Sequence, residues 1–113
     1  MASKNYEIGR RFEYRVQNWL RKEGYYVQRS YASKGLVDLI AVPPFIKLGW
    51  SNIPLGIQAK KNGYVHPSEM KTLLECKSKW QMMIVIAWSD KKRKLRFRTV
   101  DGIEIPLESL KAK

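Results

Sequence analysis

Two short apolar runs decide how this chain folds: LVDLIAV at residues 36–42 and LGIQAKK at residues 55–61. Each predicts a β-strand, because aliphatic residues dominate it and a proline or glycine lies close behind it. The first run carries one carboxylate, Asp38, and the second carries Gln58 and Lys60. Side chains two residues apart on a strand point to the same face of the sheet. Burying such polar groups costs roughly several kcal/mol unless partners or a metal ion compensate them, so these three residues are candidates for a functional site.

The segments around these two runs predict an α/β domain. Apolar residues at helical spacing predict helices at residues 6–23 and 67–80. Further strands are predicted at residues 25–29, 81–88, 94–99 and 103–105. The tail from Ser109 is expected to be short and frayed. This order of elements predicts a central mixed β-sheet flanked by helices, in one domain that spans residues 1–113.

The charge of the chain points to a polyanionic partner. The 113 residues include 22 Lys and Arg against 10 Asp and Glu, a net charge of +12. Such an excess destabilises a compact fold by self-repulsion, so it favours a nucleic-acid partner, with an anionic membrane surface as a weaker candidate. A basic protein without a special partner is the remaining alternative.

Other features favour a cytoplasmic protein, in a cell or, for a virus-encoded copy, in the host cell. The N-terminus lacks the apolar stretch of a signal peptide, and no apolar run reaches the length of about 20 residues that spans a membrane. The only cysteine, Cys76, cannot form an internal disulfide and is predicted to be a buried or half-buried thiol.

The candidate site depends on how the two apolar strands pair. If they are adjacent and antiparallel, Asp38, Gln58 and Lys60 converge at one end of the sheet, and the first helix brings in Glu13. Two carboxylates and an amide carbonyl form an all-oxygen ligand set, which suits Mg²⁺, with Mn²⁺ as a substitute. Lys60 beside such an ion would stabilise a phosphoryl transition state or orient the attacking water. This pattern suits phosphodiester hydrolysis, but Asp and Lys are also ordinary residues at strand edges.

Two further features have alternative interpretations. Glu13 borders the apolar face of its helix, so it is either a surface residue paired with a helix neighbour or an acid that faces the sheet edge. Lys94, Arg96 and Arg98 alternate along one strand, so they form either the solvated face of an edge strand or a phosphate track.

Four separated motifs together resemble the archaeal-type Holliday junction resolvases of the PD-(D/E)XK nuclease superfamily. They are GRRFE at residues 9–13, GYYVQRS at 24–30, SKGLVDLIA at 33–41 and IQAK at 57–60. The resemblance covers roughly the first 60 residues, in the family's order and spacing. Agreement of several motifs makes it more specific than a lone acid and lysine pattern.

The resemblance implies a restriction-endonuclease-like core and a homodimer that makes paired, Mg²⁺-dependent nicks in four-way DNA junctions. By position, Glu13, Asp38 and Gln58 match the metal site, and Lys60 matches the catalytic lysine. The residues expected to contact DNA are Arg10, Arg29, Ser30, Ser33, Lys34 and Lys61.

The sequence departs from the family pattern at two positions. Val37 stands where a proline is usual, which matters little. Gln58 stands where an acid is usual, and because its amide supplies an oxygen but no charge, metal affinity should fall. Two alternative functions therefore remain: a nuclease of the same fold that acts on other branched or linear DNA, and a non-catalytic nucleic-acid-binding module with a degenerate site.

Overall fold

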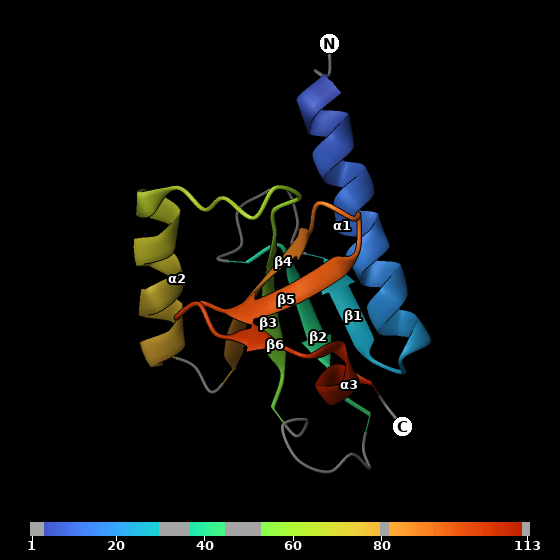
Figure 1. Ribbon diagram of the computed structural model, residues 1–113. Coiled ribbons are helices and arrows are strands. Elements are labelled where there is room, and N and C mark those ends of the chain that lie inside the picture. Colours follow the sequence, from blue (N-terminus) through green and yellow to red (C-terminus); the bar gives the residue numbers. More distant parts are fainter. Residues whose placement is uncertain (1–3, 30–36, 45–52, 80–81, 112–113) are drawn as a thin grey trace.

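The computed structural model describes residues 4–29, 37–44, 53–79 and 82–111 (Figure 1). Its helices are α1 (Lys4–Lys22), α2 (Pro67–Lys79) and α3 (Leu107–Leu110). Its strands are β1 (Tyr26–Arg29), β2 (Leu39–Val42), β3 (Leu55–Ala59), β4 (Met83–Ser89), β5 (Leu95–Thr99) and β6 (Glu104–Ile105). The predicted helices and strands are therefore present, with ends that differ by a few residues.

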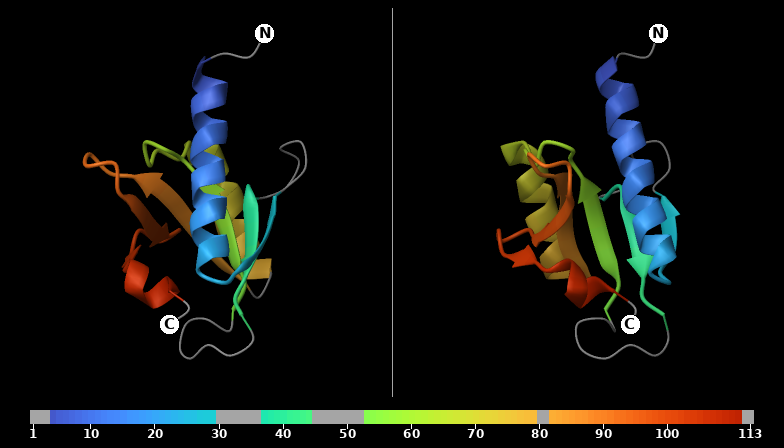
Figure 2. Two further views of the ribbon diagram at one scale, coloured as in Figure 1. Left: turned by 90° about the vertical axis from the view of Figure 1, so that its right-hand side faces the viewer. Right: turned by 45° about the vertical axis from the view of Figure 1, so that its right-hand side comes forward.

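All six strands belong to one mixed sheet, in the order β1-β2-β3-β4-β5-β6. Neighbouring strands are antiparallel except β3 and β4, which are parallel and are connected through α2. The two long helices lie on opposite faces of the sheet, as both panels of Figure 2 allow the reader to follow. This arrangement confirms the expected α/β architecture with a central mixed sheet and flanking helices.

A glycine cap ends α1 and turns the chain into β1. Gly24 has a φ of 96°, in the left-handed region that glycine adopts without steric penalty. The Tyr25 N–H donates to the Leu20 carbonyl and the Gly24 N–H to the Arg21 carbonyl, each at 3.0 Å. These two bonds satisfy the last carbonyls of the helix in a Schellman motif, so α1 ends where the sequence predicts.

Each face of the sheet has its own apolar core. The larger core joins α1 to the sheet through buried residues such as Val16, Leu39 and Phe97. The smaller core lies under α2 and includes Leu73 and Cys76, which confirms the predicted buried thiol. At the adjoining end of β3, the half-buried Gln58 contacts Glu69 of α2.

Two sequence-based expectations for the C-terminal part were wrong. The tail from Ser109 is not simply frayed, because residues 107–110 form α3, Leu110 is buried, and its carbonyl accepts a 2.8 Å hydrogen bond from the Tyr25 hydroxyl. β5 is not an edge strand either, because it pairs with both β4 and β6.

The basic stripe on β5 is largely engaged within the protein. Arg96 forms ion pairs with Asp90 and Glu104. Arg98 donates to the Gly63 carbonyl and lies over the Trp88 ring, 4.8 Å from its centroid. These contacts favour a structural role for two of the three cations over a phosphate track.

Within the described ranges, no helix combines the length and apolar character that crossing a bilayer requires.

Candidate active site

Asp38 and Gln58 lie side by side at one end of the β2–β3 pair. β2 pairs with β3 in the antiparallel register that places Leu39 opposite Ile57, so Asp38, one residue before β2, comes beside Gln58. The Asp38 N–H donates to the Ile57 carbonyl, and the Asp38 Oδ2 accepts from the Ala59 N–H, both at 2.9 Å. The backbone of β3 therefore holds this carboxylate in place, as the predicted antiparallel pairing requires.

The surroundings of Asp38 disfavour its charged form. Burial raises the pKa of the Asp38 carboxyl, the hydrogen bond from the Ala59 N–H lowers it, and the negative charge of Glu13 raises it further. Lys60 lowers the pKa of Asp38 and Glu69 raises it, each with a smaller effect. A half-buried carboxylate with two acids in its neighbourhood is a group that a bound cation would stabilise.

Lys60 and Gln58 meet on a residue that the sequence did not single out for the site, Glu69. The Lys60 Nζ lies 2.8 Å from Glu69 Oε2, and the Gln58 Nε2 donates to the same oxygen at 3.3 Å. This confirms that Gln58, in β3, and Lys60, one residue past its end, point to the same side. Glu69 lies in the first turn of α2, nine residues after Lys60. That short connection, which brings the start of a helix back to the end of the preceding strand, was the signal that could have found it.

Glu13 reaches the site from the other face of the sheet. It projects from α1, its side chain is only 17% exposed, and its Oε1 pairs with the Arg29 Nε at 2.5 Å. Its negative charge also raises the pKa of Asp38. The structure therefore supports the inward-facing interpretation of Glu13 and places Arg29, at the end of β1, beside it.

Of the predicted DNA-contacting residues, the structure describes Arg10, Arg29 and Lys61. Arg10 is exposed on α1, one turn before Glu13, and its Nη2 donates to the Tyr14 hydroxyl at 3.2 Å. That hydrogen bond and the positive charge of Arg10 lower the pKa of Tyr14. Arg29 pairs with Glu13 as described. The remaining loop residues of the prediction, Ser30, Ser33 and Lys34, lie outside the described residues.

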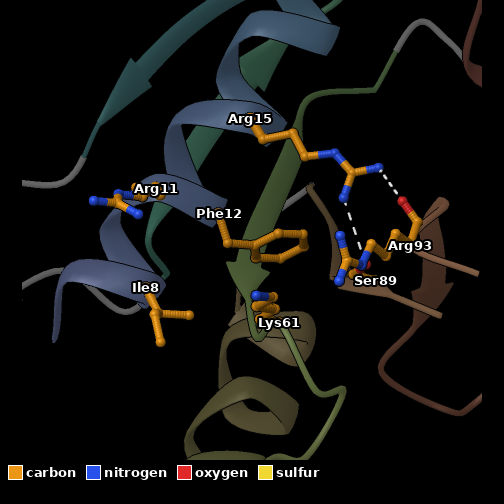
Figure 3. A pocket seen from close by; sticks show the side chains of 7 residues that line it. All are labelled: Ile8, Arg11, Phe12, Arg15, Lys61, Ser89 and Arg93. Carbon is orange, nitrogen blue, oxygen red and sulfur yellow. Dashed lines mark hydrogen bonds between the residues drawn. The ribbon is translucent and has the colours of Figure 1, made fainter. Parts of the chain in front are cut away.

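Lys61 lines a hollow that we call the basic groove, which lies between α1 and the turn that joins β4 to β5 (Figure 3). Its basic lining residues are Arg11, Arg15, Lys61 and Arg93. Arg15 reaches across from α1, with its Nη2 2.6 Å from the Arg93 carbonyl and its Nη1 3.4 Å from the Ser89 hydroxyl. A neighbouring hollow shares Lys61 and Arg93 with this groove and extends to Lys60. The candidate site therefore opens onto a cationic surface, of which the sequence had indicated only Lys61.

Comparison with known protein families identifies the family of this chain. Residues 4–108 match the family described as archaeal Holliday junction resolvase (hjc). This chain belongs to that family. The match spans most of the chain, and the resolvases of this family are crossover junction endonucleases of recombination and repair. The family that the four sequence motifs had indicated is thereby confirmed.

The structure of this resolvase also resembles that of Archaeoglobus fulgidus Hjc, a Holliday junction resolvase from an archaeal hyperthermophile. The two align with a TM-score of 0.67 and 20% sequence identity, over 91% of this chain and 96% of that chain. At that identity the likeness shows a shared fold, which confirms the expected restriction-endonuclease-like core. A comparison with curated protein sequences found no match to this chain.

Members of this family are generally metal-dependent nucleases, so the fit of the site to a cation matters. Among the residues that the structure describes, no three His, Cys, Asp or Glu side chains stand together as a ready-made metal site. Asp38 and Glu13, with the Gln58 carbonyl, nevertheless offer hard oxygen donors, and Asp38 is an acid that its own surroundings leave poorly stabilised. This donor set suits Mg²⁺ or Mn²⁺ and is unsuited to metals that prefer sulfur or imidazole ligands.

Proposed function

We propose that this resolvase cuts four-way DNA junctions by hydrolysing phosphodiester bonds at a site made of Glu13, Asp38, Gln58 and Lys60. The observation that carries this proposal is the juxtaposition of Asp38 and Gln58 at the end of β3, with Lys60 on the same face. The proposed cofactor is Mg²⁺, with Mn²⁺ as a substitute, held by Glu13, Asp38 and the Gln58 carbonyl oxygen. We place the activity inside a cell, where junction DNA is found.

Each side chain has a separate part in this chemistry. When bound, the cation supplies Lewis acidity towards a phosphate oxygen and lowers the pKa of water. The Ala59 N–H holds the Asp38 carboxylate in place. The Lys60 ammonium, which Glu69 holds at 2.8 Å, offsets negative charge that grows on the phosphate as the bond breaks.

Gln58 is the weak point of the site, and it keeps a second function in consideration. An amide oxygen can ligate a hard cation but brings no charge, so cation affinity should be lower than with a carboxylate at this position. That feature favours, as the alternative, a module that binds junction DNA without cutting it.

The DNA is proposed to run along the cationic surface beside the site. Lys61 and Arg93 of the basic groove line a neighbouring hollow together with Lys60. Arg10 and Arg29 lie near Glu13. The proposed DNA contacts also include Ser30, Ser33 and Lys34. Since such contacts replace counterions on phosphates, binding should weaken steeply with salt.

A homodimer is proposed as the active form. A two-fold symmetric protein with two sites can cut two opposed strands of a two-fold symmetric junction. An apolar patch on β1 and β2 supports this proposal. Tyr26, Ile40 and Val42 are exposed on the face opposite α1, and Tyr26 pairs directly with Val42. A second copy of the chain would cover these side chains.

Cleavage of a supercoiled plasmid that extrudes a cruciform tests the activity and the dimer together. Two cuts in one encounter give linear DNA, whereas a single nick relaxes the supercoil and removes the cruciform. We expect a linear product that requires Mg²⁺ or Mn²⁺. Asp38→Asn and Lys60→Ala should each lower the cleavage rate about a thousandfold or more, because each removes several kcal/mol of transition-state stabilisation, and should leave junction binding intact.

Three results would contradict these proposals. Undiminished cutting by both variants would mean that the site is elsewhere. A nicked circle as the only product would argue against the dimer. Metal-independent binding without cutting at any enzyme concentration would favour the non-catalytic alternative.

A further inference from the structure

Without a contribution from α2, the residues of the proposed site carry too little negative charge to attract a divalent cation. Of the residues at the end of β2 and β3, Asp38 is negative, Lys60 is positive and Gln58 is neutral, so these three alone carry no net charge. A site that attracts a divalent cation needs net negative charge from its ligands. Glu13 is the other acid of the proposed set, but the Arg29 guanidinium pairs with it at 2.5 Å. The cation site therefore lacks charge unless another acid takes part.

Glu69 is placed to supply that charge. Its Oε2 accepts the Gln58 Nε2 at 3.3 Å and lies 2.8 Å from the Lys60 Nζ. It thus contacts both Gln58 and Lys60. Its negative charge also raises the pKa of Asp38. With Glu69 included, the group around Asp38 regains the net negative charge that a carboxylate at position 58 would have given it.

The hydrogen bond to Glu69 also orients the Gln58 amide. An amide whose nitrogen donates to one neighbour turns its carbonyl oxygen to the opposite side. With Nε2 committed to Glu69 on α2, Oε1 is the atom left to face away from α2. That oxygen is the one that the proposed metal site uses.

Stability alone does not account for this arrangement. The side chains of Lys60 and Glu69 are 28% and 37% exposed, and ion pairs with that much solvent contact stabilise a fold by only about 0–1 kcal/mol. Because the pair stays open to solvent, a substrate and a cation can reach it.

We propose that Glu69 supplies, from α2, the negative charge that position 58 lacks, and that it positions the Gln58 amide with its carbonyl oxygen available to the cation. This inference rests on the proposed metal site of Glu13, Asp38 and Gln58. Glu69 acts through Gln58 and Lys60, so it is a positioning residue of the proposed site.

Exchange of the two side chains tests this role. Mn²⁺ binding to the metal-free full-length protein is measured by titration calorimetry, without DNA. Glu69→Gln should weaken Mn²⁺ binding about ten- to hundredfold, as loss of residues that orient metal ligands does. In the double variant Gln58→Glu/Glu69→Gln, the carboxylate and the amide exchange positions, and most of the lost affinity should return. The matched control is Glu75→Gln, which removes the same charge from an exposed position of α2 and should leave the affinity unchanged.

The outcomes separate this inference from the proposal beneath it. Wild-type affinity in Glu69→Gln would overturn the role of Glu69. A loss that the double variant does not recover would also overturn it, because Glu69 would then act only by supporting local structure. Full Mn²⁺ binding by Asp38→Asn would instead show that the proposed metal site is itself wrong. Recovery by the double variant also shows that replacing Glu69 does not unfold the protein.

Discussion

Asp38 and Asp90 are two carboxylates of one sheet with opposite surroundings. Both carboxylate oxygens of Asp90 accept hydrogen bonds. Its Oδ1 accepts from the N–H groups of Lys92 and Lys94 in its own turn, and its Oδ2 accepts from the Nε of Arg96 in β5. The backbone hydrogen bond from Lys94 and the side-chain bond from Arg96 hold the pKa of Asp90 below its ordinary value. Asp38 accepts one backbone hydrogen bond from Ala59, and burial raises its pKa.

The difference separates a structural acid from the acid that we propose for the active site. The ion pairs around Asp90 complete a turn and lie among charges that cancel within the protein. Around Asp38, burial and the neighbouring acids Glu13 and Glu69 disfavour the charged carboxylate, and a bound cation would stabilise it. Basic residues occur near both acids, so positive charge by itself does not identify the site in a chain with a net charge of +12.

The largest expected contrast is in stabilisation by metal. Mn²⁺ at about a hundredfold excess over its dissociation constant should stabilise the wild-type protein by about 2.7 kcal/mol, or roughly 10 °C in Tm. Asp90→Asn should show the same rise, and Asp38→Asn should show none. Thermal unfolding with and without Mn²⁺ measures this. An equal response of both variants would remove the distinction between the two acids.

A smaller contrast is expected in DNA binding. Lys61 lines the basic groove, whereas Arg96 is engaged by Asp90 and Glu104. Lys61→Ala should weaken junction binding several-fold and reduce the slope of log affinity against log salt by about 1. Arg96→Ala should leave that slope unchanged. Binding titrations at several salt concentrations measure both, and a slope that falls equally in the two variants would argue against the groove as the DNA path.

The smallest effect is on stability without metal, and its sign differs between the acids. A carboxyl whose native pKa is raised costs stability once it ionises, so the penalty from Asp38 grows as pH rises from its ordinary value of 3.8 through the raised native value. Asp38→Asn should therefore raise Tm at neutral pH by roughly a few degrees, with no gain below the ordinary value. For Asp90, whose native pKa is lowered, the stabilisation is present at neutral pH and lost in acid.

Asp90→Asn should accordingly lower Tm at neutral pH, by an amount that shrinks as the pH falls. Thermal unfolding over a pH series in a chelating buffer gives both curves. If Asp38→Asn lowers Tm at neutral pH, then burial does not penalise the Asp38 carboxylate in the way described.

Local patterns were sufficient for much of the fold and part of the site. The alternation in residues 55–61 predicts that Gln58 and Lys60 share a face, and their joint contact with Glu69 confirms it. The helical spacing before Gly24 predicts α1 and its cap. The four motifs indicate the family that the match over residues 4–108 shows. The roles of Glu13, Asp38, Gln58 and Lys60 in catalysis remain predictions.

The amino-acid sequence by itself determined most of the elements, the family and the shared face of Gln58 and Lys60, because these depend mainly on patterns along the chain. Tertiary structure decided which distant side chains meet. Glu13 with Arg29, Glu69 with Lys60, and Arg15 with the Arg93 carbonyl are contacts between separate elements. α3 likewise owes its place to the burial of Leu110 and the hydrogen bond from Tyr25. Such contacts depend on how helices are set against a sheet, and no periodicity in the sequence encodes that packing.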